Sequence, residues 1–445
     1  MNAPNTLSAT DAAQKIRQGL LSSVDLVKAC LARIDETDGE LRAWAFVDRE
    51  GALARAAEMD AIRKSGRAVG VLHGIPVGLK DIIDTKDMPT ERGTSIFAGR
   101  QPDHDATIVQ RLLEAGAVIL GKTVTTELAF VHANETRNPH NPIHSPGGSS
   151  SGSAAAVAAF QVPLAIGTQT NGSVIRPASF CGVFGFKPTR GTISRTGLLE
   201  TSRSLDQVGC FGRSLDDVAL LTDAISSYDP ADTLSFARPR PAMLDGARSD
   251  APVKPNLVWL NFPFDDRLDS DAAEGLAEVR AALGDNLDVL DAAPNLADLI
   301  GVQHTIHEYE ICQHQRDLFD AHWDDLSDTL RPVLERGRKI TKAQYDDAIG
   351  VMDSAQAFFD HLFLEYDAVI APSAKGEAPV FGNGTGDPIF CTVWTLAGLP
   401  SINLPVLVGE TGLPVGVQLI GSRETDDRLL RTANWTLNQL QGQAA

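Results

Sequence analysis

Hydrophobic residues follow two spacings along the chain, one typical of helices and the other of buried strands. Val27, Leu31 and Ile34 recur at intervals of three to four residues, which predicts an amphipathic helix. Short apolar runs bounded by glycine or proline instead predict buried strands. On these grounds we expect helices over residues 8–16, 23–34, 106–115, 153–160, 215–225 and most of 305–338, and strands over 117–120, 164–168, 183–186, 368–371, 401–408 and 416–420.

Local signals refine these elements. Ser8 and Asp11 form a capping pair at the start of the first helix, and Gly121 is expected to end the strand over 117–120. Residues 229–254 hold four prolines among many polar residues, so we expect a loop or crossover between two halves. Because helices and buried strands alternate to the end, the pattern predicts an α/β fold with a central sheet.

Composition narrows the classes of function. Hydrophobic residues make up 43% of the 445-residue chain, which is ample for a large core. The net charge of −19 disfavours binding to nucleic acid or to an anionic membrane, since both attract basic surfaces. The first 20 residues lack the basic start and apolar core of a signal peptide. Five scattered cysteines without a CxxC pair indicate reduced thiols in a cytoplasmic protein and argue against a zinc site.

One segment carries no charge at all. Between Arg137 and Arg176, 38 residues contain no Asp, Glu, Lys or Arg, although 22% of the chain is charged. Exposed segments usually carry charge, so this one is predicted to be buried. Its apolar part, residues 154–166, is shorter than the roughly 20 residues of a membrane span. We therefore expect a buried segment that brings hydroxyl groups and flexible backbone to one place.

Two simpler interpretations of residues 147–152 fail on context. A glycine- and serine-rich run is commonly a flexible linker, but here an alanine-rich stretch that needs burial follows at once. The run also matches the GxSxG nucleophile elbow of α/β-hydrolases at Gly148, Ser150 and Gly152, which must follow directly on a buried strand. Three prolines within residues 138–146 exclude a central strand there.

Three groups of residues resemble the hallmarks of the amidase signature family. They are Gly147-Gly148-Ser149-Ser150, Thr170-Asn171-Gly172-Ser173 and Gly74-Ile75-Pro76-Val77-Gly78-Leu79-Lys80-Asp81. Residues 121–127, 180–189 and 397–421 are also similar to family segments and come in the family's order, whereas about 229–339 is uninformative. The resemblance implies one domain over residues 1–445, with a mixed central β-sheet surrounded by α-helices.

The same resemblance implies a Ser–cis-Ser–Lys catalytic triad. Ser173 would be the nucleophile, Ser149 the bridging serine in a cis peptide with Gly148, and Lys80 the base. Ser150 is expected to donate a supporting hydrogen bond to the lysine.

Amide hydrolysis also needs donors for the oxyanion of the transition state. Ser173 follows a predicted strand in a glycine-containing turn, whose backbone N–H groups can converge on one oxygen. Asn171 stands where the family more often has glycine, and asparagine is among the few residues that tolerate positive φ. We therefore expect the turn to form an oxyanion hole despite this substitution. Its donors are the N–H groups of Thr170, Asn171, Gly172 and Ser173.

Lys80 must be neutral to act as a base. An ordinary lysine has a pKa of about 10.4, so burial has to lower it. The apolar residues 71–79 supply such a setting. A lysine after an apolar run is usually solvated, and only the triad context reverses that interpretation. Asp81 is then expected to be a structural neighbour.

Other residues have two interpretations each. Arg176 follows the nucleophile in the Ser-Val-Ile-Arg-Pro form of a malonamidase-like branch, whose matching arginine grips a substrate carboxylate; alternatively, it is tied to backbone carbonyls or an internal acid. Thr168 could line the site. The histidines of the 304–322 region are more typical of solvated helix faces than of metal ligands, so no metal is expected. For Trp323, Trp394 and Phe130, core packing is a safer interpretation than a pocket wall.

These observations predict a cofactor-free amidase that hydrolyses the C–N bond of small amides through an acyl-enzyme on Ser173. We expect residues 125–145 and 300–345 to shape its pocket. The expected partner is a small-molecule amide or carbamate, with no nucleic acid and no membrane, and a homodimer is a further option.

Three alternatives stay open. A carbamate (urethane) or ester hydrolase would use the same triad. The A-type subunit of a glutamine-dependent aminoacyl-tRNA amidotransferase belongs to the same family, although its usual Asp-Thr-Gly-Gly-Ser run is here Gln169-Thr170-Asn171-Gly172-Ser173. A non-catalytic binding module is disfavoured because all three triad positions are intact.

Overall fold

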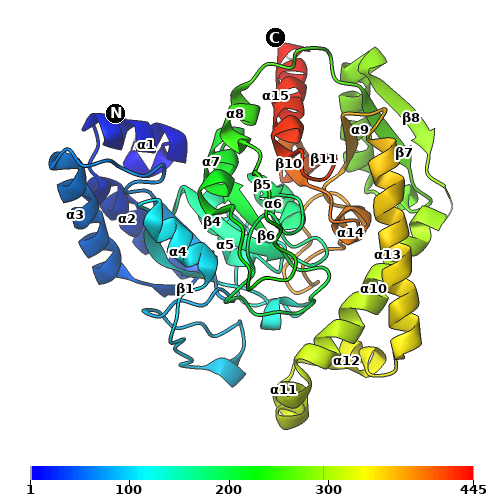
Figure 1. Ribbon diagram of the computed structural model, residues 1–445, viewed down its shortest axis with the longest axis horizontal. Helices are drawn as coiled ribbons and strands as arrows, with labels where there is room; N and C mark the ends of the chain where they lie inside the picture. Colours follow the sequence, from blue (N-terminus) through cyan, green and yellow to red (C-terminus); the bar gives the residue numbers. More distant parts are fainter. Residues whose placement is uncertain (1–2, 294, 444–445) are drawn as a thin grey trace.

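Strands from the whole length of the chain join in one mixed sheet in the computed structural model, which describes residues 3–293 and 295–443 (Figure 1). The eleven strands within these residues are ordered β1-β3-β2-β4-β6-β5-β10-β11-β9-β7-β8. The sheet confirms the predicted α/β fold. The strands are β1 Trp44–Val47, β2 Pro76–Lys80, β3 Val118–Thr123, β4 Leu164–Gln169, β5 Phe184–Lys187, β6 Gln207–Gly212, β7 Leu257–Asn261, β8 Leu287–Asp291, β9 Ala368–Pro372, β10 Ser401–Val408 and β11 Pro414–Ile420.

Antiparallel pairs fill the middle of the sheet and parallel pairs lie on either side of them, while the edge strand β1 pairs antiparallel with β3. β2 runs parallel to both β3 and β4, and β7 runs parallel to both β8 and β9. The pairs from β4 across to β9 are antiparallel. β2, β3, β4 and β6 are buried along their whole length, because other elements cover both faces of the sheet.

The helices surround this sheet. In Figure 1, α1–α4 lie toward one end of the molecule, whereas α9 and α13 lie beside β7 and β8 at the other. The helices are α1 Ala9–Gln18, α2 Ser23–Leu41, α3 Arg49–Lys64, α4 Thr107–Glu114, α5 Ser151–Ala158, α6 Ile175–Cys181, α7 Leu215–Ile225, α8 Met243–Arg248, α9 Ser270–Leu283, α10 Asn295–His314, α11 Arg316–Ala321, α12 Arg331–Gly337, α13 Lys342–Leu362, α14 Ile389–Leu396 and α15 Asp426–Gln443.

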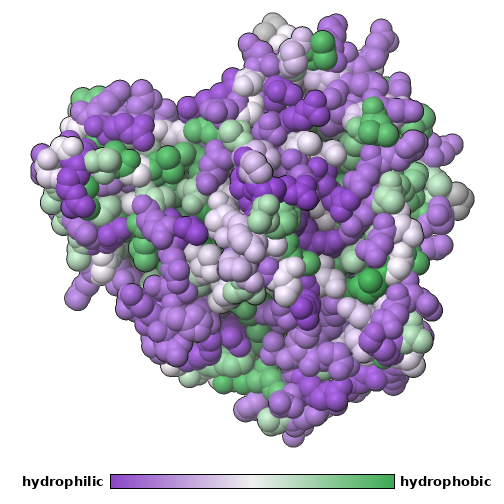
Figure 2. Space-filling model, in the orientation of Figure 1, coloured by the Kyte–Doolittle hydropathy of each residue, from purple (hydrophilic) through white to green (hydrophobic). Residues whose placement is uncertain are grey.

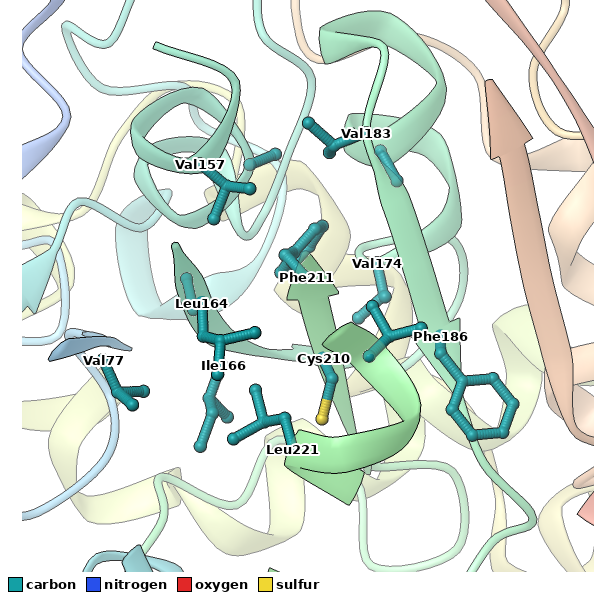
Figure 3. Close-up of a cluster of buried hydrophobic side chains, with 14 of the residues drawn as sticks. Val77, Val157, Leu164, Ile166, Val174, Val183, Phe186, Cys210, Phe211 and Leu221 are labelled. Atoms are coloured by element: carbon teal, nitrogen blue, oxygen red, sulfur yellow. The ribbon is translucent and has the colours of Figure 1, made fainter. Parts of the chain in front are cut away.

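The core gathers where α5 and α7 meet the middle of the sheet. Figure 3 shows Val157 of α5 and Leu221 of α7 with side chains of β4 and β6, such as Ile166 and Phe211, between them. All four side chains are buried. Burying aliphatic and aromatic side chains of this size stabilises a fold by roughly 1.5–3 kcal/mol each, which makes this part of the sheet a rigid base for the loops at its edge.

Most predicted elements are present. The elements expected over 215–225 and 401–408 coincide with α7 and β10, and Ser8 caps α1 by accepting the N–H of Asp11 at 3.0 Å. The expectation for Gly121 is wrong. β3 continues through this residue. A Cβ at this position would lie only 2.1 Å from the carbonyl oxygen of Phe46 on β1, so glycine allows the two strands to pair closely.

Several elements have no clear signal in the sequence. β6 contains two glycines and a glutamine, so it lacks the apolar run of a buried strand. β8 lies at the edge of the sheet and is mostly exposed, so its pattern is not that of a core strand. The helical region expected over 305–338 begins earlier, at Asn295, and is divided into α10, α11 and α12.

Residues 229–254 connect α7 to β7 and include the short helix α8. The start of this segment is fixed to the body of the protein, since Asp232 pairs with Arg195 at 2.7 Å. Hydrophilic side chains cover most of the face seen in Figure 2. Among the described residues, no helix is both long enough and apolar enough to cross a membrane.

Candidate active site

Lys80, Ser149 and Ser173 lie at the ends of neighbouring elements, two strands and a helix. Lys80 ends β2, and Ser173 lies in the turn between β4 and α6. Because β2 and β4 are adjacent parallel strands, their carboxyl ends meet at the same edge. Ser149 lies just before α5, which packs against both strands. The fold therefore brings residues from three separate segments toward one place.

Lys80 and Ser149 are in direct contact. Lys80 Nζ donates a hydrogen bond to Ser149 Oγ at 2.7 Å and another to Thr168 Oγ1 at 2.8 Å. Lys80 is fully buried and Ser149 is 2% exposed. The Gly148–Ser149 peptide bond is cis, as the family resemblance implies. The Ser149 hydroxyl is thus held against the lysine amine away from bulk water.

Ser150 has a different partner from the one we expected. Its hydroxyl donates to Thr168 O at 3.2 Å and accepts the N–H of Thr168 at 3.2 Å, instead of bonding Lys80. Thr168 then contacts Lys80 through its own hydroxyl. Ser150 therefore supports the lysine through Thr168, because it binds the backbone of the strand that presents this threonine.

Burial lowers the pKa of Lys80 to about 7, against the opposing effect of the Asp206 carboxylate. This value agrees with the expectation that the lysine can be neutral near physiological pH. Asp81 belongs to another cluster. Its carboxylate lies 3.9 Å from Lys122 Nζ and accepts the N–H of Glu91, which makes it a structural neighbour as expected.

Ser173 lies at the wall of a cavity of about 240 Å³ and is partly exposed. No acceptor among residues 3–293 and 295–443 receives the backbone N–H of Asn171, Gly172 or Ser173. Within these residues, no hydrogen bond joins the hydroxyls of Ser173 and Ser149. The turn thus presents three consecutive free N–H donors beside a serine hydroxyl.

The backbone of Asn171 is not left-handed, so the tolerance of asparagine for positive φ does not explain why this residue replaces glycine. The side chain has a structural task instead: it donates to Gln303 Oε1 at 3.2 Å and accepts from Thr392 Oγ1 at 2.7 Å. An asparagine in place of glycine therefore ties this turn to α10 and α14.

Both regions expected to shape a pocket contribute to the cavity. Phe130 lies in its wall with its ring centroid 4.4 Å from that of His307 on α10. A third region, residues 385–388, was not anticipated; its only sequence signal is the glycine-rich run before it. The lining residues are Ala129, Phe130, Val131, Thr170, Asn171, Gly172, Ser173, Arg176, Gln303, His304, His307, Glu308, Val333, Arg336, Thr385, Gly386 and Pro388.

Arg176 is held by backbone carbonyls. Its guanidinium donates to Gly148 O at 2.6 Å and Gly386 O at 2.8 Å, and burial lowers its pKa to about 10. The structure therefore shows the interpretation in which Arg176 is tied to backbone carbonyls, and through Gly148 O it supports the cis peptide that carries Ser149. It also lines the cavity, with its Nε atom buried and unpaired among the described residues.

A second cavity of about 320 Å³ adjoins the first, since Ala129 and Thr170 line both. Thr168 lies in its wall together with Asp206. The Asp206 carboxylate accepts a hydrogen bond from the Thr170 hydroxyl. Thr168 thus separates this cavity from Lys80.

The three aromatic residues divide between cavity and core. Trp394 is buried against Phe262 and Phe359, which agrees with core packing, and Trp323 lies under the guanidinium of Arg338. Phe130 instead lines the cavity. Within the described part of the chain, no group of three or more His, Cys, Asp or Glu side chains is arranged to hold a metal ion.

Comparison with known proteins agrees with this geometry. The Amidase family matches residues 25–430. The A-type subunit of glutamyl-tRNA(Gln) amidotransferase from Agathobacter rectalis is 34% identical over 96% of this chain and 93% of its own. The peptide amidase of Stenotrophomonas maltophilia has a TM-score of 0.82 at 30% identity, with 98% and 97% of the two chains covered. An inhibitor-bound vestigial complex, described as revealing the origins of an s-triazine catabolic enzyme, contains a chain with a TM-score of 0.92 at 29% identity, covering 98% and 99%.

The fold and the match over most of the chain define the class: the chain belongs to the Amidase family. It is an amidohydrolase that acts on amide C–N bonds.

Proposed function

We propose that this amidase hydrolyses small amides through a covalent acyl-enzyme on Ser173. The observation that carries the proposal is the buried contact of 2.7 Å between Lys80 Nζ and Ser149 Oγ. A lysine with a pKa lowered to about 7 can accept a proton, and a serine held against it can pass that proton on.

The chemical steps follow from this arrangement. Ser173 Oγ attacks the amide carbonyl while its proton passes through Ser149 to Lys80. The free N–H groups of residues 171–173 stabilise the oxyanion. As the C–N bond breaks, Lys80 returns the proton through Ser149 to the leaving amine. Water then attacks the acyl ester by the same route and restores the Ser173 hydroxyl.

The cavity favours a small acyl group. About 240 Å³ is below the roughly 300–1,000 Å³ of sites for drug-sized ligands. The apolar wall contains Phe130 and Val333, whereas Arg176 places positive charge on the same cavity. A substrate carboxylate near Arg176, as in the malonamidase-like branch, is therefore a second interpretation beside its bracing role.

The test of the nucleophile is Ser173→Ala. We expect turnover to be lost, because no other hydroxyl would attack the carbonyl, and the free energy of unfolding to change by less than about 1 kcal/mol. A serine-reactive fluorophosphonate should label the wild type and the control variant Ser354→Ala on α13, and leave Ser173→Ala unlabelled. Residual activity above about a tenth of wild type, or labelling of Ser173→Ala, would contradict the assignment.

Two further functions use the same triad. Carbamates and esters pass through the same tetrahedral intermediate, so a carbamate (urethane) hydrolase is the first. A subunit of an amidotransferase is the second, favoured by the 34% identity to such subunits. A panel of anilides, aliphatic amides, malonamate and aryl carbamates separates the hydrolases. Release of ammonia from glutamine that requires an added partner would identify the transamidase, whereas the enzyme we propose acts alone.

A further inference from the structure

Side chains from two distant helices hold the carbonyl groups of the turn that carries Ser173. Gln303 of α10 donates from Nε2 to Thr170 O at 3.0 Å, and Thr395 of α14 donates from Oγ1 to Asn171 O, which lies nearer to this hydroxyl than Cys391 O at 3.0 Å. Both side chains are fully buried. Water does not compete for these bonds, so the two carbonyl groups are fixed in direction.

The direction of each carbonyl sets the direction of the next N–H. In a trans peptide, the C=O of one residue and the N–H of the following residue point to opposite sides. When Gln303 holds Thr170 O, the N–H of Asn171 faces away from that bond. When Thr395 holds Asn171 O, the N–H of Gly172 likewise faces away from the hydrogen bond with Thr395. Both N–H groups are among those of the turn that have no acceptor among the described residues.

We propose that Gln303 and Thr395 are positioning residues of the oxyanion hole. Each holds one peptide of the turn so that its N–H, and not its carbonyl oxygen, faces the reacting atoms. A peptide that rotated would present a carbonyl oxygen to the oxyanion, which would repel it. This inference rests on the proposed function, because it assumes that Ser173 attacks and that the turn binds the oxyanion.

The Gln303 amide is itself locked. Its Oε1 accepts a hydrogen bond from Asn171 Nδ2 at 3.2 Å while its Nε2 donates to Thr170 O, so only one orientation of the amide satisfies both partners. Thr395 is also positioned, because its hydroxyl accepts from Gln169 Nε2 at 2.9 Å. Gln169 Oε1 in turn accepts the N–H groups of Val174 and Ile175 just after the nucleophile.

The test combines Gln303→Leu, Thr395→Val and Thr395→Ser. We expect the first two to lower kcat by about 10- to 100-fold, somewhat less than the loss of an oxyanion donor itself, and to change KM by less than about 3-fold. Thr395→Ser keeps the hydroxyl and should restore most of the activity. The control is Gln313→Leu, an exposed position on the same helix, which should leave kcat unchanged.

A boronic acid forms a tetrahedral adduct with serine that resembles the oxyanion intermediate. Its binding therefore distinguishes residues that position the oxyanion hole from residues that only stabilise the fold. Its Ki should rise in Gln303→Leu and Thr395→Val by the same factor as kcat/KM falls, whereas Ki for the product carboxylate should stay unchanged. Gln303→Met keeps the length of the side chain but has no donor for Thr170 O, so it should behave like Gln303→Leu. This variant also serves as the reporter if Gln303→Leu does not fold.

Two results would overturn the proposal. One is kcat within about 2-fold of wild type in Gln303→Met and Thr395→Val while Ser173→Ala is inactive. The other is a loss of kcat in these variants with unchanged affinity for the boronic acid. Activity that survives in Ser173→Ala would instead mean that the nucleophile, and hence the proposed function, is wrong.

Discussion

At the scale of single residues, the site depends on a lysine that the fold keeps out of water. The apolar strand β2 ends at Lys80, and burial there lowers the pKa of its amine to about 7. The hydroxyls of Ser149 and Thr168 are its hydrogen-bond partners, and neither carries a charge that would hold the ammonium form. Burial without a carboxylate in direct contact therefore suits this lysine to the role of base that we propose.

We expect kcat/KM to rise with pH through about 7 and to level off in mild alkali, because only neutral Lys80 accepts a proton. Lys80→Met should remove this rise together with most of the activity. Lys80→Arg should fail equally, since a guanidinium is not deprotonated in proteins. The measurement is a pH–rate profile of each variant, with the exposed Lys342→Arg as the control. Near-normal activity of Lys80→Arg would mean that the proton travels by another route.

At the scale of elements, α10 connects the cavity wall with the support of the site. Gln303 and His307, one turn apart on this helix, both line the cavity. The next turn carries the buried Glu310, whose carboxylate accepts from Ser204 N at 3.0 Å and from Tyr345 Oη of α13 at 2.7 Å. α10 is thus anchored to two other segments one turn away from the residues that line the cavity.

Glu310→Ala is expected to lower the free energy of unfolding by about 2–3 kcal/mol, because it leaves several buried donors without an acceptor. Urea unfolding measures the change. Glu335→Ala on the exposed face of α12 is the matched control and should lie within about 0.5 kcal/mol of wild type. Equal effects of the two substitutions would mean that the Glu310 contacts do not stabilise α10.

At the scale of the whole molecule, buried lysines make stability depend on pH. Burial lowers the pKa of Lys187 on β5 to about 7, from an ordinary value of 10.5. Below about pH 7 the folded protein has to hold the buried Lys187 in its charged ammonium form, so its unfavourable contribution to the free energy of unfolding is at its largest. Between about 7 and 10.5 the unfolded chain binds more protons than the folded one, so this contribution fades and stability rises with pH.

Lys187→Met should therefore flatten the rise of unfolding free energy between pH 7.5 and 9.5 (the range of the test). The difference in slope from wild type should approach about 1.4 kcal/mol per pH unit, the value for one proton. Urea unfolding at several pH values measures it, with the exposed Lys342→Met as the control. Parallel curves for wild type and Lys187→Met would show that Lys187 stays charged in the folded protein.

The sequence by itself determined the class of fold and supplied the candidates for the reacting groups that we propose. The spacing of hydrophobic residues predicts whether a segment is a helix or a strand and whether it is buried, because these properties depend on the local sequence. The helix α7 and the strand β10 illustrate this. The uncharged segment between Arg137 and Arg176 indicated a buried site before any geometry was known. The motifs around Lys80, Ser149 and Ser173 then named its candidate residues.

Only the tertiary structure decided how these residues are supported. Gln303 bonds a residue 133 positions away, and Thr395 bonds one 224 positions away, so no local pattern could pair them. The same holds for Arg176, which braces the Gly148 carbonyl, and for Ser150, which bonds Thr168 in place of the lysine. Such contacts depend on which strands become neighbours in the sheet, and that order is set by packing of the whole chain.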